Sequence, residues 1–177
     1  MNFFKLVISD FKIIKVKDPA AHSWLETLLC HHPFYAILTY RMAHVLHKWK
    51  IPVLPRFMCQ FVKIFTGVEI HPGAKIGKSF FIDHGTGTVI GETAEIGDRV
   101  AIFQGVTLGG RGHSYGKRHP TLKNDVLIGA NAILLGPIVI GEGSIIGAAS
   151  VVLQDVPDHA TVVGNPGRVV KIKGERV

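Results

Sequence analysis

Among the segments that place a histidine beside a charged residue, two could do chemistry, and the first of them is Asp83-His84, just before a glycine-rich turn. A histidine can act as a general base toward a hydroxyl group because its ordinary pKa lies near neutrality. A carboxylate within hydrogen-bonding distance would fix the tautomer of the ring, and Glu69 and Asp83 are both candidates. The alternative is a corner histidine with a structural hydrogen bond, and spacing alone does not decide between these interpretations.

The second segment is Arg118-His119, within GGRGHSYGKRHPTLK. Both side chains are expected to be cationic. We also expect this loop to be mobile enough to close over the carboxylate of an acceptor, which arginine binds through paired hydrogen bonds. The alternative is an ordinary solvated loop. His113 in the same loop is expected to be exposed. The remaining histidines lack the ligand spacing of a zinc site, so we predict no metal.

These residues need a rigid scaffold, and a six-residue repeat from residue 68 onward indicates one. Glycine often follows the repeating aliphatic residue, and a small or β-branched residue comes four positions after it. The aliphatic residues are Ile70, Ile76, Ile82, Ile90, Ile96, Ile102, Leu108, Leu122, Ile128, Leu134, Ile140, Ile146 and Val152. Neither a helix nor simple alternation gives this period. It predicts a parallel β-helix, because the strands of a β-sandwich would be about 8–12 residues apart.

The repeat is interrupted at the two histidine segments. Two extra residues stand between Ile82 and Ile90, and the spacing from Leu108 to Leu122 is fourteen positions. We interpret the longer interruption as an excursion that replaces two hexads. Insertions in a solenoid form loops on one face, often the binding face. We therefore expect the chemistry of the protein at these two interruptions.

The distribution of glycine divides the chain, since all 20 glycines lie at or after Gly67. We predict an N-terminal helical segment over residues 1–66 and a β-helix over 67–165, with a protruding loop at 109–121. Residues 166–177 are expected to form a C-terminal tail.

Prolines mark the expected helix boundaries in the first segment. Asp18-Pro19 is predicted to be an N-cap followed by proline at the first helical position. Pro33 should separate one helix from the next, and Pro52 and Pro55 should end the second. A short third helix is expected at about 54–65.

Charge and composition limit the classes of partner that we expect this protein to bind. The net charge is +7, and residues 1–63 carry nine Lys and Arg against three acidic residues. A basic segment could contact nucleic acid or anionic lipid, but we favour amphipathic helices with solvated lysines and predict neither partner. No stretch approaches the ~20 apolar residues that span a bilayer. Two scattered cysteines, Cys30 and Cys59, fit a reducing cytoplasm.

Four segments of the chain resemble the serine O-acetyltransferases, a family of hexapeptide-repeat acyltransferases: EIHPGAKIG, FIDHGTGTVIGETAEIG, VTLGGRGHSYGKRHPTLKNDVLIGA and VVGNPGRVVKI. DPAAHSWLETLLCHHPFYAILTYRMAH resembles the helical segment of that family. The resemblance covers residues 15–171. HPGAKIG-type hexads are shared by many acyltransferases, whereas DHGTGTVIGET with GKRHP is more specific. The resemblance implies a left-handed β-helix, a homotrimer with active sites between subunits, and acetyl transfer from acetyl-CoA to L-serine at the start of cysteine biosynthesis.

The resemblance also implies roles for individual residues. His84 would be the general base and Glu69 its carboxylate partner, with direct transfer and no metal. The residues that would hold the amino and carboxylate groups of serine are Asp83, Arg118, His119 and Asp18. Those that would line the acetyl-CoA channel through main-chain contacts are Gly110, Ala130 and Ala148. L-cysteine would compete with serine as a feedback inhibitor.

The chain departs from the family pattern in three ways. Many members have aspartate where Glu69 stands, so the carboxylate here is one methylene farther along its side chain. The N-terminal region is shorter than in long-form members, which favours a trimer over a hexamer. The chain ends in valine, not the isoleucine that docks into O-acetylserine sulfhydrylase, so we do not expect that complex.

Two other functions are open on the sequence. One is an O-acetyltransferase of the same fold that acts on a sugar hydroxyl, and the other is a non-catalytic scaffold. Arg118 and Asp18 favour an amino-acid acceptor, because a sugar needs no pair of charges to bind it. Asp83-His84 disfavours a scaffold, which would gain nothing from an interrupted repeat.

Overall fold

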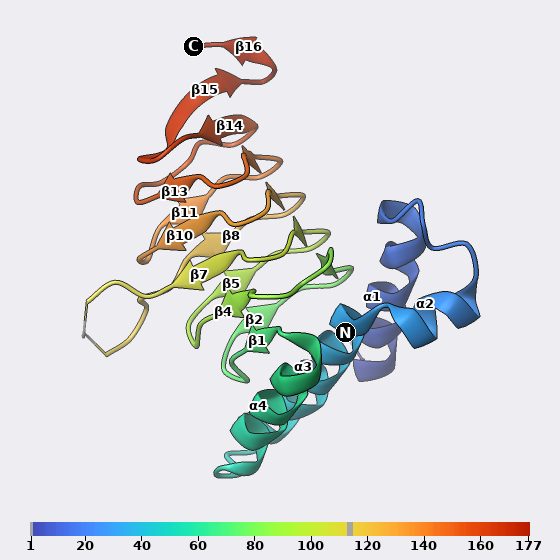
Figure 1. The fold of residues 1–177 in the computed structure, drawn as a ribbon. Coiled ribbons are helices and arrows are strands. Elements are labelled where there is room, and N and C mark those ends of the chain that lie inside the picture. Colours follow the sequence, from blue (N-terminus) through green and yellow to red (C-terminus); the bar gives the residue numbers. More distant parts are fainter. Residues whose placement is uncertain (1, 113–114) are drawn as a thin grey trace.

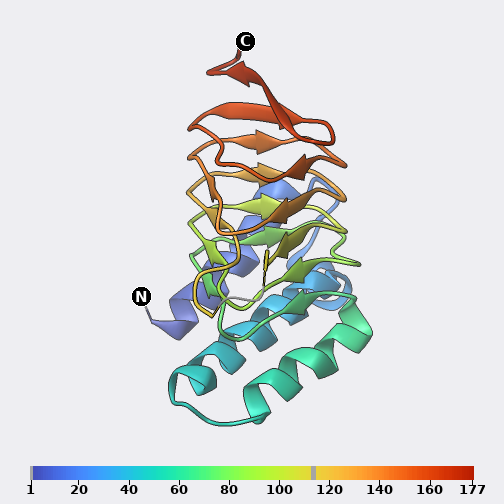
Figure 2. The ribbon, with the colours of Figure 1, turned by 90° about the vertical axis from the view of Figure 1, so that its left-hand side faces the viewer.

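A stack of coils rises from a helical base (Figures 1 and 2). The computed structural model describes residues 2–112 and 115–177. Four helices come first, namely α1 (Phe3–Lys17), α2 (Trp24–Cys30), α3 (His32–Lys48) and α4 (Leu54–Thr66). In both views α3 and α4 lie beneath the lowest coil, and α1 lies along its side. Within the described residues, no helix is long and apolar enough to cross a membrane.

The predicted N-cap at Asp18 is wrong. Asp18 ends α1, and its backbone N–H donates to the carbonyl oxygen of Ile14 at 2.8 Å. Aspartate followed by proline also favours a turn, and that is the conformation adopted here. The next helix is instead capped by Ser23, whose hydroxyl accepts a hydrogen bond from the backbone N–H of Glu26 at 3.1 Å.

The other prolines lie at helix starts and ends. Pro33 lies in the first turn of α3, as expected for a residue that separates two helices. Pro52 follows α3, but Pro55 does not end that helix because it lies in the first turn of α4. Proline is well tolerated there because the first N–H groups of a helix have no intrahelical acceptor.

After α4 the chain winds through three faces, which confirms the predicted parallel β-helix. The first face consists of β1 (Glu69–Ile70), β4 (Val89–Ile90), β7 (Thr107–Gly109), β10 (Ile133–Leu135) and β13 (Val151–Val152). The second consists of β2 (Lys75–Ile76), β5 (Glu95–Ile96), β8 (Thr121–Leu122) and β11 (Val139–Ile140). The third consists of β3 (Phe81–Ile82), β6 (Ala101–Ile102), β9 (Leu127–Ile128), β12 (Ile145–Ile146) and β14 (Ala160–Val163).

The core is the column of aliphatic side chains inside these coils. On the first face the parallel register aligns Ile70 with Ile90, then Leu108 and Leu134, and finally Val152. All five side chains are buried. Burial of one such side chain contributes about 1.5–3 kcal/mol to the free energy of unfolding, so the stacked column holds the corners in fixed positions.

Both interruptions of the repeat are corners of the coil. Residues 83–88 form a corner with two extra residues, as expected. The longer interruption does not replace two hexads, because β7 and β8 are consecutive strands on adjacent faces. The register advances by 26 residues from Ile96 to Leu122, against 18 in the uninterrupted coil from Ile90 to Leu108. Eight residues are therefore added to one corner, which forms the protruding loop (Figure 1).

A buried ion pair joins the helices to the lowest coil. Nε of Arg41 on α3 lies 3.0 Å from Oδ2 of Asp10 on α1. The Arg41 guanidinium also donates to the carbonyl oxygens of Ile76 and Gly77, and Asp10 accepts from the backbone N–H of Phe80 at 3.0 Å. This network of polar contacts thus joins two helices to one corner of the coil.

The last strands close the other end of the stack. β15 (Arg168–Ile172) pairs antiparallel with β14, and β16 (Glu175–Arg176) pairs antiparallel with β15. The chain therefore leaves the parallel winding after residue 163.

Candidate active site

His84 projects from the corner between β3 and β4. Its backbone has φ +57°, which is uncommon for a residue with a Cβ atom, and Gly85 follows with φ +78°. Ser79, Arg99 and Asn131 have the same left-handed backbone, so this conformation is a property of the corners of the coil. The side chain is 74% exposed, and its Nε2 lies 3.9 Å from Oδ1 of Asp83. A solvent-accessible imidazole on a rigid corner can accept a proton from a bound hydroxyl group.

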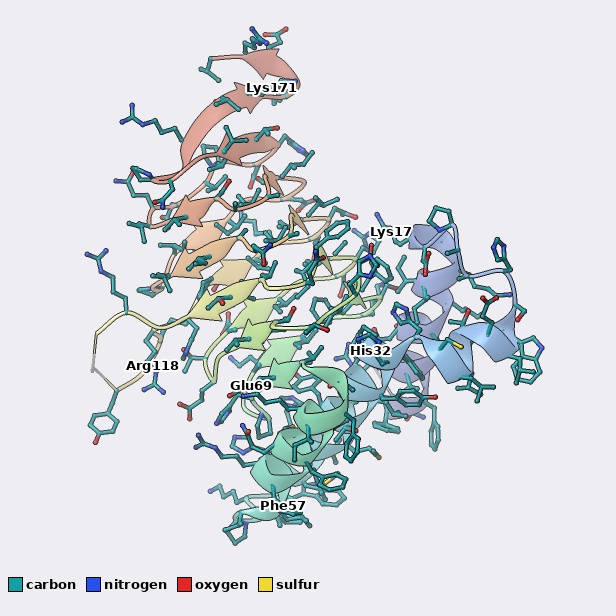
Figure 3. All side chains as sticks on the ribbon, viewed as in Figure 1. Lys17, His32, Phe57, Glu69, Arg118 and Lys171 are labelled. Atoms are coloured by element: carbon teal, nitrogen blue, oxygen red, sulfur yellow. The ribbon has the colours of Figure 1, made fainter. Side chains whose placement is uncertain are left out.

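Glu69 lies close to this corner in the coil below. Its backbone N–H donates to the carbonyl oxygen of Thr88 at 2.9 Å. Its carboxylate is bound by Nζ of Lys63 at 2.5 Å and by Nε2 of Gln60 at 3.4 Å. The hydrogen bond from Lys63 lowers the pKa of Glu69. Figure 3 shows Glu69 at the base of the stack, next to the helices. No hydrogen bond or ion pair joins Glu69 to His84 within the described residues, so its predicted pairing with the base stays a prediction.

Asp18 and Asp83 lie near a histidine that sequence reasoning missed. Burial lowers the pKa of His31, and the Asp18 and Asp83 carboxylates oppose this effect. The His31 ring stacks on Phe81 with ring centroids 5.8 Å apart. Its Nε2 is buried without a hydrogen-bond partner. His31 lies in the helical segment that resembles the family, but its spacing does not single it out, so only the fold reveals that it lies beside two predicted serine-binding carboxylates.

Arg118 lies at the end of the protruding loop (Figure 3). Its Nη2 donates to Oε2 of Glu92 at 2.8 Å, and both side chains are partly exposed. Paired contacts of this kind are weak in water and exchange readily. Arg118 can therefore turn a donor to an incoming carboxylate without a large cost in free energy.

His119 differs from its neighbour, and the expectation of a mobile cationic side chain is wrong for this residue. The side chain is 7% exposed. Burial lowers the pKa of the His119 ring, and the positive charges of Arg118 and Lys117 lower it further, whereas the Glu92 carboxylate opposes this effect. The ring lies beside Gly91 and Gly110, and each glycine leaves room for it.

Thr93 is a second residue that sequence reasoning missed. The backbone N–H groups of Arg118 and His119 both donate to its hydroxyl oxygen, at 3.0 and 3.1 Å. Nζ of Lys117 donates to its carbonyl oxygen at 2.7 Å. The sequence places Thr93 at the end of the segment DHGTGTVIGET but gives it no role, because that role depends on a loop 25 residues away.

The two histidine segments lie at opposite ends of one strand. His84 stands in the corner before β4, whereas Glu92 and Thr93, which hold Arg118 and His119, follow the same strand directly. Within the described residues of one chain, no contact brings the two segments together.

The residues predicted to line an acetyl-CoA channel also occupy both edges. Ala130 and Ala148 lie in successive corners on the edge that carries His84, and the backbone N–H of Ala149 donates to the carbonyl oxygen of Ala130 at 2.8 Å. Gly110 is exposed on the other edge, beside Arg118. Glycine or alanine at all three positions leaves no large side chain over the main chain. In the part of the chain that the structure describes, no cluster of three His, Cys, Asp or Glu residues could hold a metal.

Residues 119–154 match the family model of the bacterial transferase hexapeptide (six repeats). The chain is 56% identical over 174 residues to a serine acetyltransferase of Synechococcus elongatus, which covers 98% of this chain and 71% of that protein. It is 55% identical to the serine acetyltransferase of Bacillus subtilis, over 99% of this chain and 81% of the relative. The chain belongs to the serine acetyltransferase family.

Solved structures of serine acetyltransferases share the fold. The Neisseria gonorrhoeae enzyme superimposes with a TM-score of 0.92 at 42% identity, covering 96% of this chain and 65% of its own. A serine acetyltransferase in complex with cysteine superimposes with a TM-score of 0.93 at 41% identity, covering 96% of this chain and 70% of its own. The chain thus spans about two thirds of these structures, and the coil is the left-handed β-helix of the family.

Proposed function

We propose that this chain transfers the acetyl group of acetyl-CoA to the hydroxyl of L-serine, which yields O-acetyl-L-serine and CoA. The observation that carries this function is 50–56% identity, over nearly the whole chain, to relatives named serine acetyltransferase. Enzymes of this name have been solved with serine and with cysteine bound. We place the reaction in the cytoplasm, as the first step of cysteine biosynthesis.

His84 acts as the general base. Its imidazole takes the proton of the serine hydroxyl while the oxygen attacks the thioester carbonyl of acetyl-CoA. The carbon–sulfur bond then breaks, and the CoA thiolate leaves and takes the proton from the imidazolium. Proton transfer by a positioned side chain contributes about 10²–10⁴-fold to the rate. Glu69, or Asp83 at 3.9 Å, stabilises the imidazolium.

Serine binds between unlike charges. The Arg118 guanidinium donates hydrogen bonds to the serine carboxylate, since arginine offers two parallel donors to that group. Asp83 and Asp18 bind the ammonium group on the side of His84, near His31. L-cysteine carries the same ammonium and carboxylate groups and has a thiol in place of the hydroxyl. It therefore occupies the same site as an inhibitor.

Acetyl-CoA lies along the small corner residues Gly110, Ala130 and Ala148. Their main-chain groups are free of large side chains, so the pantetheine arm can approach the backbone. The net charge of +7 complements the phosphates of the co-substrate.

A homotrimer completes the site, because His84 and Arg118 lie at opposite ends of β4. A ring of three copies places the His84 edge of one chain against the Arg118 edge of the next. The α4 helix supports this assembly with an exposed apolar face next to Glu69, formed by Phe57, Phe61, Ile64 and Phe65. A contiguous apolar surface of this kind is typical of an interface.

The identity of the acceptor is tested by measuring the release of free thiol from acetyl-CoA in the presence of L-serine, L-homoserine or a panel of hexoses. We expect release with serine, much less with homoserine, and none above background with hexoses. Release with a hexose and not with serine would replace the proposal by a sugar O-acetyltransferase.

The composite site is tested by mixing two impaired variants, His84→Ala and Arg118→Ala, after they have been unfolded and refolded together, with activity measured at a serine concentration well below the KM of Arg118→Ala. If each site takes one segment from each of two chains, about one quarter of the sites in random mixtures contain both native residues. Activity should then return to about that fraction of the wild-type value. If both segments serve a site within one chain, mixing restores nothing.

A further inference from the structure

The hydroxyl of Thr93 has a fully determined set of hydrogen bonds. Thr93 lies in the corner between β4 and β5, facing the end of the protruding loop. Its oxygen accepts from the backbone N–H of Arg118 at 3.0 Å and from that of His119 at 3.1 Å. These two donors use both lone pairs of the oxygen. The hydroxyl hydrogen is therefore free to point at Nδ1 of His119, which lies 2.9 Å away.

The backbone of Thr93 fixes the direction of that contact. Its N–H donates to the same Nδ1 of His119 at 3.2 Å. A backbone amide can only donate, so Nδ1 must be an acceptor and carries no proton. The neutral ring therefore has its proton on Nε2.

Nε2 of His119 is left available for a ligand. Within residues 2–112 and 115–177 it has no hydrogen-bond partner. A Cβ atom on Gly110 would lie 3.2 Å from this nitrogen and 3.3 Å from Cγ and Cδ of Arg118. The free Nε2–H and the Arg118 side chain therefore flank the same exposed glycine, and a carboxylate placed there meets donors from both.

We propose that Thr93 is a positioning residue for the acceptor site, which holds His119 in the Nε2–H tautomer and fixes the backbone that carries Arg118. Thr93 itself does not touch the substrate. It acts through two donors to Nδ1 and two accepted backbone bonds, so that the loop presents a fixed N–H donor next to the guanidinium. This inference rests on the proposed function for the identity of the acceptor, but the tautomer does not depend on it.

Two different substitutions separate the hydroxyl from the bulk of the side chain. Thr93→Val keeps the shape and removes the hydroxyl, whereas Thr93→Ser keeps the hydroxyl. A third variant, Lys117→Ala, serves as a control for loop attachment, because Lys117 binds the carbonyl oxygen of Thr93 without contacting the ring.

The first readout is the tautomer of His119, measured by nitrogen-15 NMR of histidine-labelled protein, with a His119→Asn variant to assign the signal. We expect a single Nε2–H tautomer in the wild type, in Thr93→Ser and in Lys117→Ala. Thr93→Val keeps the backbone N–H, but it loses the hydroxyl donor to Nδ1 and both bonds that hold the end of the loop, so the ring should move away from that N–H and show a mixture of tautomers or a protonated ring. An Nδ1–H tautomer in the wild type, or an unchanged spectrum in Thr93→Val, would overturn the inference.

The second readout is steady-state kinetics. Loss of one oriented hydrogen bond corresponds to about a tenfold effect, so Thr93→Val should raise the KM for serine about tenfold. The KM for acetyl-CoA should stay within about twofold, and Thr93→Ser should stay near the wild type. Equal losses toward both substrates would indicate a merely structural role and contradict the inference. A wild-type enzyme inactive with serine would refute the proposed function alone, because the NMR result stands without it.

Discussion

The imidazole ring of His119 lies where a side chain on Gly91 would have to be. A Cβ atom built on Gly91 would approach Cδ2 and Nε2 of that ring to 2.0 Å, far below any real contact. Glycine at this corner is thus a condition for the buried position of His119, and through it for the geometry of the loop end. The two residues come from different coils, 28 positions apart.

Gly91→Ala should therefore displace His119 and weaken serine binding. We expect the KM for serine to rise at least about tenfold, while the KM for acetyl-CoA changes little, since a misplaced donor no longer reaches the carboxylate. Gly77→Ala is the matched comparison, because its Cβ would meet the backbone of Gly97 at 2.7 Å, away from the loop. That variant should lower the melting temperature without a selective effect on serine. Identical kinetic profiles for the two variants would contradict this interpretation.

His84→Ala should lower kcat about 10²–10⁴-fold, the usual contribution of a general base. The fold should persist, because the side chain is 74% exposed. His159→Ala is the matched control, since His159 is also an exposed corner histidine with a left-handed backbone, at φ +58°. It should keep wild-type activity. Near-wild-type turnover in His84→Ala would exclude His84 as the base.

Arg118→Ala should chiefly raise the KM for serine, because the substitution removes the guanidinium that binds its carboxylate. Arg111→Ala changes another exposed arginine of the same loop and should leave this constant unchanged. An unchanged KM for serine in Arg118→Ala would point to a different acceptor. Initial rates at saturating acetyl-CoA provide the comparison.

Asp10→Asn should destabilise the protein severely. Arg41 is 4% exposed and Asp10 is fully buried, and loss of one partner leaves an uncompensated buried charge that costs about 3–5 kcal/mol. Glu95→Gln breaks the exposed pair with Lys75 and should cost at most about 1 kcal/mol, since solvent screens that pair. Denaturant unfolding of both variants gives the comparison. Similar losses would show that the Asp10–Arg41 pair does not anchor the helices.

The sequence predicts the coil well because the fold is encoded by one repeated requirement. Each aliphatic residue of the hexads must point into the coil, and residues such as Ile90 and Leu108 align in register as the period demands. The helix boundary near Asp18 was mispredicted because aspartate and proline suit a turn as well as a helix start. Ser23 and Glu26 carried the better capping signal, three residues apart.

The site is less predictable because its contacts cross between coils. Spacing drew attention to His84 and Arg118, since both lie where the repeat fails. It could not show that His119 is buried, or that Thr93 binds it, because these depend on how an eight-residue insertion folds back onto a corner 25 residues earlier. The burial of His31 near Asp18 and Asp83 is likewise a product of helix packing.

The most direct test is the identity of the product formed from acetyl-CoA labelled with carbon-13 in its acetyl group. Incubation of the purified protein with this co-substrate and L-serine should yield O-acetyl-L-serine in equal amounts with free CoA, detected by mass spectrometry and NMR. Replacement of His84 by alanine should suppress the product. Release of CoA without an acetyl ester on the serine oxygen, or acetylation of a sugar in preference to serine, would contradict serine acetylation as the function of this chain.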